Sequence, residues 1–170
     1  SILALGQSAS KAVTTGPGTF TGQRVCLAFA RGLRVALKIA LPGVTTLQAM
    51  ATAAIAETGV AYAAALHDAR RNEVYFEVLR EDQTLIPAAI ATFEDAMAAI
   101  SRTTRNAKLA FAGTAAETAA IAYRGEAIVT PIRQPDALWV GRIALTRKAS
   151  NEAPKPLYLR PPDAKLPAKK

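Results

Sequence analysis

Cysteine and histidine are almost absent from this chain of 170 residues, which contains one of each, Cys26 and His67. A single cysteine has no partner for a disulfide within the chain and cannot form a CxxC pair. A single histidine excludes a metal site built on two histidine side chains. His67 is also the sole histidine that a Ser/His/Asp triad can use, and no nucleophile elbow lies near it. We therefore predict no catalytic and no metal-binding residues, and we expect Cys26 to be a small buried apolar residue.

Aromatic residues and long apolar runs are also scarce. Aromatic side chains make up 6% of the chain although 51% of its residues are hydrophobic, so its core must consist largely of alanine, valine, leucine and isoleucine. No apolar stretch reaches the roughly 18 uncharged residues that a membrane-spanning helix needs. The length is sufficient for one domain, or two small lobes, with a sizeable core. Together with the lone cysteine, these features predict a cytoplasmic protein without a membrane partner.

Acidic residues are outnumbered by basic ones, 13 against 21, which gives a net charge of +8. Such a balance favours phosphate-rich or acidic partners. Much of the excess, however, lies in a proline-rich tail that we do not expect to pack, at Lys155, Arg160, Lys165, Lys169 and Lys170. No basic stretch is interleaved with aromatic residues, as is typical of proteins that stack exposed bases. Charge alone is therefore weak support for direct RNA binding.

The stretch GPGTFTGQR, residues 16–24, follows a β-branched segment at 12–15 that reads as a strand. Two glycines around a proline predict a sharp turn, and Thr19 or Thr21 can then cap a helix. Free backbone N–H groups and the positive end of a helix converge in such a turn, as in an anion site. The same build also forms an ordinary strand-to-helix corner, and both interpretations stay open. The candidate anion-binding or nucleotide-binding residues are Gly16, Gly18, Thr19, Thr21 and Gly22.

The apolar run that follows predicts a helix over 22–39 with two distinct faces. Basic residues form one stripe, at Arg24, Arg31, Arg34 and Lys38. We expect the opposite apolar face to pack on the protein's own sheet, through Val25, Phe29, Leu33, Ala36 and Leu37. Between these faces lie Ala28 and Gly32, a small pair that lets another backbone approach closely. Glycine within a helix costs about 1 kcal/mol relative to alanine, so a contact at Gly32 is expected to offset that cost.

The remainder of the chain alternates between predicted strands and helices, which indicates an α/β fold. A helix at 47–57, capped by Thr45 or Thr46, ends at Gly59. Two strands, at 60–66 and 73–80, are joined by a turn at 68–72, where Asn72 is expected to adopt a left-handed backbone. We interpret Asp68, Arg70 and Arg71 as a capped turn with solvated arginines rather than as a catalytic cluster. The later elements are a helix at 93–101, a strand at 108–112, a helix at 115–123, a strand at 127–129 and a helix at 136–149.

Three stretches carry a resemblance to a known family. GPGTFTGQRVCLAFARGL, at 16–33, resembles the GPGSFTGLR…A.GLA signature of the bacterial TsaB (YeaZ) family. HDARRNEVY, at 67–75, is similar to the DARRGEVY hairpin of that family, with Asn72 in place of its glycine. PLYLRPP, at 156–162, resembles its C-terminal YLRP motif. The matches follow the order of the family and span nearly the whole chain.

This resemblance implies the actin-like, Hsp70-like and sugar-kinase-like (ASKHA) fold, with two ribonuclease-H-like lobes. We expect a partial N-terminal lobe at 1–58, a C-terminal lobe at 59–154 and a basic proline-rich tail at 155–170. Complete family members carry further strands and a helix ahead of the glycine turn, so we expect the N-terminal lobe to be incomplete. The absent part would include the strand pair that grips phosphate in relatives with working nucleotide sites.

The resemblance also implies a function in tRNA modification. TsaD transfers a threonylcarbamoyl group onto the adenosine next to the anticodon of tRNAs that read ANN codons, and TsaE is an ATPase. A TsaB-like chain would be a non-catalytic subunit that scaffolds and activates TsaD. The expected partners are TsaD and TsaE, with a second copy in a homodimer as an option when alone, and with tRNA contacted only indirectly. We expect no cofactor on this chain alone, and the resemblance leaves open whether ATP or ADP binds at an interface of the complex.

Two alternatives belong to other classes of protein. An actin-like nucleotide-binding ATPase or phosphotransferase would need the phosphate loop that we expect to be absent. A free-standing RNA-binding module is supported only by charge.

In the resembled family, the helix predicted at 22–39 packs against equivalent helices of TsaD or of a second copy. We therefore predict that it forms the partner interface, through Arg24, Ala28, Arg31, Gly32 and Val35.

Overall fold

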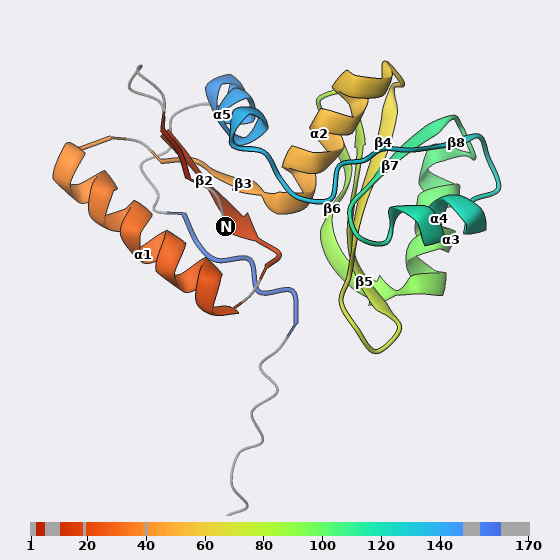
Figure 1. The fold of residues 1–170 in the computed structure, drawn as a ribbon, viewed down its shortest axis with the longest axis horizontal. Helices are drawn as coiled ribbons and strands as arrows, with labels where there is room; N and C mark the ends of the chain where they lie inside the picture. Colours follow the sequence, from red (N-terminus) through yellow and green to blue (C-terminus); the bar gives the residue numbers. More distant parts are fainter. Residues whose placement is uncertain (1–2, 6–10, 19, 40, 148–153, 161–170) are drawn as a thin grey trace, which may run out of the picture.

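The computed structural model describes residues 3–5, 11–18, 20–39, 41–147 and 154–160, which form two β-sheets with helices packed on them (Figure 1). A three-stranded sheet has the order β1-β2-β3, and a five-stranded sheet has the order β6-β5-β4-β7-β8. The α/β class expected from the sequence is confirmed. The elements are β1 (Leu3–Leu5), β2 (Lys11–Gly16), α1 (Phe20–Leu37), β3 (Gly43–Thr45), α2 (Thr46–Thr58), β4 (Tyr62–Asp68), β5 (Glu73–Arg80), β6 (Gln83–Thr92), α3 (Phe93–Thr104), β7 (Leu109–Ala112), α4 (Ala116–Ala122), β8 (Ala127–Val129) and α5 (Ala137–Thr146).

The smaller sheet is covered by a helix on each face. β1 runs antiparallel to β2, and β2 runs parallel to β3. Successive residues of a strand point to opposite faces, so Val13 packs with Leu27 of α1 while Ala12 packs with Val140 of α5. Each face of this sheet therefore buries a core of its own.

The larger sheet is mixed and is likewise buried on both faces. β4, β5 and β6 form an antiparallel meander, and β7 and β8 continue the sheet in parallel with β4. On β5, Phe76 and Val78 point toward α3 and α4, whereas Leu79 points toward α2. The side chains of this strand thus alternate between the two faces, which gives a hydrophobic layer on each side of the sheet.

Helix α2 lies between the two sheets (Figure 1). Its buried side packs on the larger sheet through Met50 and Ala54, and on the smaller sheet through Ala49. Thr45 caps its N-terminus by accepting a hydrogen bond from the Gln48 backbone N–H at 2.8 Å. Gly59 ends it in a left-handed conformation with φ 71°, as expected.

The face of α1 that packs on the sheet differs from our expectation. Leu27 and Ala30 are buried against Val13 and Leu41, whereas Val25 is 65% exposed and Phe29 is 60% exposed. Leu37 also lies half in solvent, and Ala36 is exposed. The correction has a simple physical reason: this helix is apolar on more than one side, so hydrophobicity alone does not select the face that meets the sheet. Only Leu33 of the predicted face is partly covered.

The C-terminal segment also departs from expectation, because residues 154–160 pack on the smaller sheet and on α1 (Figure 1). The Leu157 backbone N–H donates to the Thr15 carbonyl at 2.9 Å. Arg31 donates to the Pro154 carbonyl through Nη2 at 2.9 Å and through Nε at 3.2 Å. The arginines of α1 thus hold the segment that we expected to stay unpacked. The remainder of the tail lies outside the described residues.

Three strands, β1, β3 and β6, were absent from our predictions, and the short β3 lies in the segment that we expected only to lead into the helix at 47–57. β1 lies in a stretch without a clear period, and β6 follows β5 through a tight turn at Glu81, where φ is 54°. β6 contains Pro87, which cannot donate to a ladder hydrogen bond, and it lies at the edge of the sheet, where proline is tolerated. Within the described part of the chain, no helix combines the length and hydropathy needed to cross a membrane.

Candidate functional site

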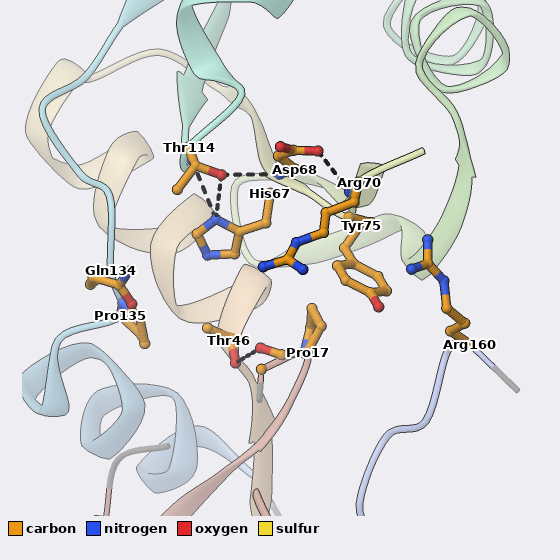
Figure 2. Close-up of a pocket in the computed structure, with 12 residues that line it drawn as sticks. Pro17, Thr46, His67, Asp68, Arg70, Tyr75, Thr114, Gln134, Pro135 and Arg160 are labelled. Carbon is orange, nitrogen blue, oxygen red and sulfur yellow. Dashed lines mark hydrogen bonds between the residues drawn. The ribbon is translucent and has the colours of Figure 1, made fainter. Parts of the chain in front are cut away.

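A cavity of about 660 Å³ lies between the two sheets, and its lining includes three segments that are far apart in the chain (Figure 2). The turn after β2 contributes Pro17 and Gly18. The end of β4 and the following turn contribute residues 67–70. The C-terminal segment contributes Arg160. These are the three stretches that carry the sequence motifs, so the fold brings motifs that are far apart in the chain to one site.

The glycine turn at the edge of this cavity is filled by a side chain of the protein itself. Gly16 has φ +117°, and a Cβ at this position would lie 2.4 Å from Nε2 of Gln23. Gln23 is buried, and its Nε2 donates to the Gly18 carbonyl at 3.0 Å. Thr46 donates through Oγ1 to the Pro17 carbonyl at 2.9 Å. The buried Gln23 amide therefore occupies the concave side of the turn and fixes its shape.

The predicted anion-binding residues are distributed around this turn. Gly16 and Gly18 lie in the turn itself, and Gly22 lies in the first turn of α1. Thr21 is the second residue of α1 and is exposed, so it is not the residue that caps the helix. Thr19 lies outside the described residues. Whether this turn binds an anion stays a prediction.

His67 lines the cavity in a defined tautomer. The Thr114 backbone N–H donates to His67 Nδ1 at 3.3 Å, so this ring nitrogen is the acceptor and the proton of the neutral ring lies on Nε2. Burial lowers the pKa of His67, which favours the neutral ring. Thr114 Oγ1 also accepts from the Asp68 backbone N–H at 3.0 Å, so the loop after β7 is tied to the end of β4. His67 thus presents an N–H donor at the cavity wall.

The turn between β4 and β5 places an arginine over the cavity. Arg70, Arg71 and Asn72 all have positive φ, at 63°, 55° and 60°. The left-handed conformation expected for Asn72 is confirmed, and so is the capping role of Asp68, whose Oδ1 accepts from the Arg70 backbone N–H at 2.8 Å. We expected both arginines to be solvated at this turn. Both are exposed, yet Arg70 extends back over the cavity between His67 and Tyr75 (Figure 2).

Arg160 closes the other side of the cavity through an ion pair. Its Nη2 contacts Glu73 Oε2, and the two side chains are 23% and 35% exposed. This contact joins the YLRP-like segment to the first residue of β5. Neither the convergence of the motifs nor this pair was predicted from the sequence, although the three motifs themselves were the signal.

A buried carboxyl group lies at the junction of the sheets. Glu77 on β5 is 3% exposed, and burial raises its pKa to about 7. Hydrogen bonds from the Thr45 hydroxyl and the Gln48 backbone N–H, together with the Arg147 charge, act in the opposite direction on that pKa. Arg147 reaches the same place by donating to Gln48 Oε1 at 2.5 Å. This carboxyl links β5 to the N-terminus of α2.

The predicted interface residues of α1 fall into two groups. Ala28, Gly32 and Val35 are exposed, and an ideal Cβ at Gly32 would meet no atom of another described segment within 4 Å. Arg24 and Arg31 instead bind the chain itself, through Tyr158 Oη at 3.4 Å and through the Pro154 carbonyl.

The exposed face of α1 is also more apolar than our prediction had it. We use the name α1 stripe for the exposed residues Val25, Ala28, Phe29, Gly32, Val35 and Ala36.

Cys26 is partly buried and packs against the core under α1, and burial raises the pKa of its thiol. Among the described residues, no group of three or more His, Cys, Asp or Glu side chains is arranged to hold a metal ion.

Comparison with solved structures first defines the class of fold. The fold is similar to the crystal structure of an uncharacterized protein with similarity to peptidase YeaZ from Pseudomonas aeruginosa, with a TM-score of 0.69 and 26% identity. That match covers 88% of this chain and 73% of the other. The chain is therefore an α/β protein of the actin-like type found in YeaZ.

Sequence comparison then gives the family. The model of a family described as "TsaD: tRNA N6-adenosine threonylcarbamoyltransferase" matches residues 7–150. TsaB of Escherichia coli, a tRNA threonylcarbamoyladenosine biosynthesis protein, is 38% identical over 68 residues, which are 40% of this chain and 29% of that protein. An uncharacterized protein of Mycobacterium tuberculosis is 36% identical over 154 residues, 90% of this chain and 64% of that protein. The chain belongs to this family, in its TsaB (YeaZ) branch, and spans 29% to 64% of the length of these relatives.

Proposed function

We propose that this chain is a non-catalytic subunit that scaffolds and activates TsaD in the formation of threonylcarbamoyladenosine next to the anticodon of tRNAs reading ANN codons, with TsaE as a further partner. In this proposal the two sheets belong to two ribonuclease-H-like lobes. The protein is cytoplasmic and contacts tRNA only indirectly. ATP or ADP binds, if at all, at an interface of the complex. Family membership supports the process, and the α1 stripe supports the role of a binding subunit.

The α1 stripe is the observation that carries this proposal. α1 has 18 residues and is about 27 Å long, which is sufficient for a helix-on-helix seam along its whole length. Its three large side chains, Val25, Phe29 and Val35, are 65%, 60% and 73% exposed. A contiguous apolar face of this kind on one helix is typical of protein interfaces. Covering it would remove these three side chains from water.

The small residues of the α1 stripe favour a helix as the partner element. Ala28 and Gly32 lie one turn apart and leave the backbone of α1 open to close approach. Open space around Gly32 also means that no contact with the described residues offsets the cost of a helical glycine. Packing of a TsaD helix into this gap would offset that cost. Arg24 and Arg31, held by the C-terminal segment, border the stripe on one side.

The test is the affinity of the full chain for purified TsaD, measured by isothermal titration calorimetry. Phe29→Asp places a charge in the α1 stripe, and we expect it to weaken binding by about tenfold or more. Ile121→Asp is the matched control, because Ile121 is an exposed apolar residue on α4, 87% exposed, and lies outside the stripe. This control should bind TsaD like the unaltered chain. Equal affinity of both variants would contradict the proposed interface.

A further inference from the structure

The cavity between the sheets contains hydrogen-bond donors that the protein does not use. The guanidinium of Arg70 has no ion pair or hydrogen bond with any described residue, whereas its backbone N–H is bound to Asp68. Nε2 of His67 carries the proton of the neutral ring, because Nδ1 accepts from Thr114. Within the described chain, neither the Tyr75 hydroxyl nor the Gln134 amide has a hydrogen-bond partner, and both residues line the cavity. Donors from β4 and its following turn, from β5 and from the loop at Gln134 thus line one cavity.

One positively charged side chain of the cavity lining has no ion pair among the described residues. Asp68 is the acidic residue in its lining, and its carboxylate is engaged with the backbone of the turn (Figure 2). The charge of Arg160 is matched by Glu73. Asp68 and Arg70 carry opposite charges, so the lining is neutral overall, but the Arg70 guanidinium is not paired with that carboxylate and extends between His67 and Tyr75. A guanidinium with N–H and O–H donors beside it is the arrangement that proteins use for oxyanions.

We propose that the cavity binds a small molecule through a phosphate or carboxylate group held by Arg70, with His67 Nε2–H and the Tyr75 hydroxyl as further donors. The volume of about 660 Å³ lies within the range of small-molecule pockets. The glycine turn is a wall of this site rather than the anion cradle, because Gln23 fills its concave side. The proposal concerns the chain by itself and does not depend on the role proposed for the α1 stripe.

Binding at this site can be followed by NMR through His67, because it is the sole histidine of the chain and gives one set of imidazole signals. The full chain without a histidine tag is titrated with inorganic pyrophosphate, and separately with succinate, at constant ionic strength. We expect the His67 signals to shift and saturate below about 10 mM of one or both anions. Saturation with pyrophosphate alone assigns phosphate chemistry, and saturation with succinate alone assigns carboxylate chemistry. Failure of both anions to saturate the shift would overturn the proposal.

Two arginine variants distinguish anion binding at a specific site from general electrostatic attraction. Arg70→Gln removes the central cation, and we expect it to weaken the saturating anion by about tenfold or more. Arg71→Gln changes the net charge equally in the neighbouring left-handed position of the same turn, and Arg71 does not line the cavity. We expect this control to bind with at most a twofold change. If both substitutions weaken anion binding equally, the anion is attracted by the overall charge of the turn and is not bound at a specific site.

Discussion

Arg160 forms an ion pair with Glu73, a residue 87 positions earlier in the chain. The pair joins the C-terminal segment, which runs beside α1, to the first residue of β5 in the larger sheet. It therefore holds the parts of the molecule that border the cavity. Because both side chains are partly covered, their interaction is less screened by solvent than that of a fully exposed pair.

A double-mutant cycle with Arg160→Met and Glu73→Gln measures this coupling. We expect a coupling free energy of about 1 kcal/mol in urea unfolding. The reference cycle uses Lys108→Met and Glu126→Gln, since those side chains are 47% and 65% exposed. For that pair we expect a few tenths of a kcal/mol. Equal coupling in the two cycles would show that the Arg160–Glu73 pair does not contribute to the docking of the C-terminal segment.

The turn at Asn72 gives a second prediction. With φ 60°, this position suits glycine and penalises a β-branched side chain. Asn72→Gly should change stability by less than about 0.5 kcal/mol, whereas Asn72→Val should cost about 1 kcal/mol or more. Thr84→Val controls for the added valine, because Thr84 is exposed on the extended strand β6. Equal melting temperatures of the two Asn72 variants would contradict the left-handed conformation.

Glu77 makes stability depend on pH. Burial raises its pKa to about 7 from 4.5, so the folded state binds this proton more tightly than the unfolded state. Its contribution is full below pH 4.5 and is lost as pH rises toward 7. The unaltered chain should lose about 3 kcal/mol relative to Glu77→Gln over that interval.

The measurement for Glu77 is urea unfolding of both proteins between pH 4.5 and 8. Glu77→Gln keeps the size of the side chain and an oxygen that accepts from the Thr45 hydroxyl. The difference in unfolding free energy between the two proteins should change steadily up to about pH 7 and then level off. A difference that stays constant with pH would show that Glu77 titrates alike in the folded and unfolded states.

The sequence predicted well those elements whose ends are determined by residues at the ends themselves. Thr45 and Gly59 carry the capping chemistry that bounds α2, and Asn72 carries the left-handed turn between β4 and β5. β6 was missed because Pro87 interrupts its pattern, and an edge strand tolerates that proline. The buried face of α1 was assigned wrongly, because it is decided by Val13 and Leu41 rather than by the helix itself.

The candidate site was less predictable than the fold. Its motifs were recognised, yet nothing local to Arg70 indicates that it extends over a cavity bordered by Arg160 and Pro17. That proximity follows from the order of the strands and from the path of the C-terminal segment. Long-range placement of this kind depends on tertiary packing, which the periodicity of a sequence does not encode.

The most direct test of the central claim, that the α1 stripe binds TsaD, uses Gly32→Leu. Because no atom of another described segment lies within 4 Å of an ideal Cβ there, the fold should tolerate leucine and gain helix propensity of up to about 1 kcal/mol. Leu27→Ala, by contrast, removes a side chain buried against Val13 and should cost about 2–5 kcal/mol. This contrast verifies which face of α1 is core.

The decisive measurement is the affinity of Gly32→Leu for purified TsaD by isothermal titration calorimetry, beside its melting curve. The account predicts an unchanged or higher melting temperature and binding weakened by about tenfold or more, because leucine keeps the partner helix from close approach. Unaltered affinity for TsaD, or a protein that no longer folds, would contradict it.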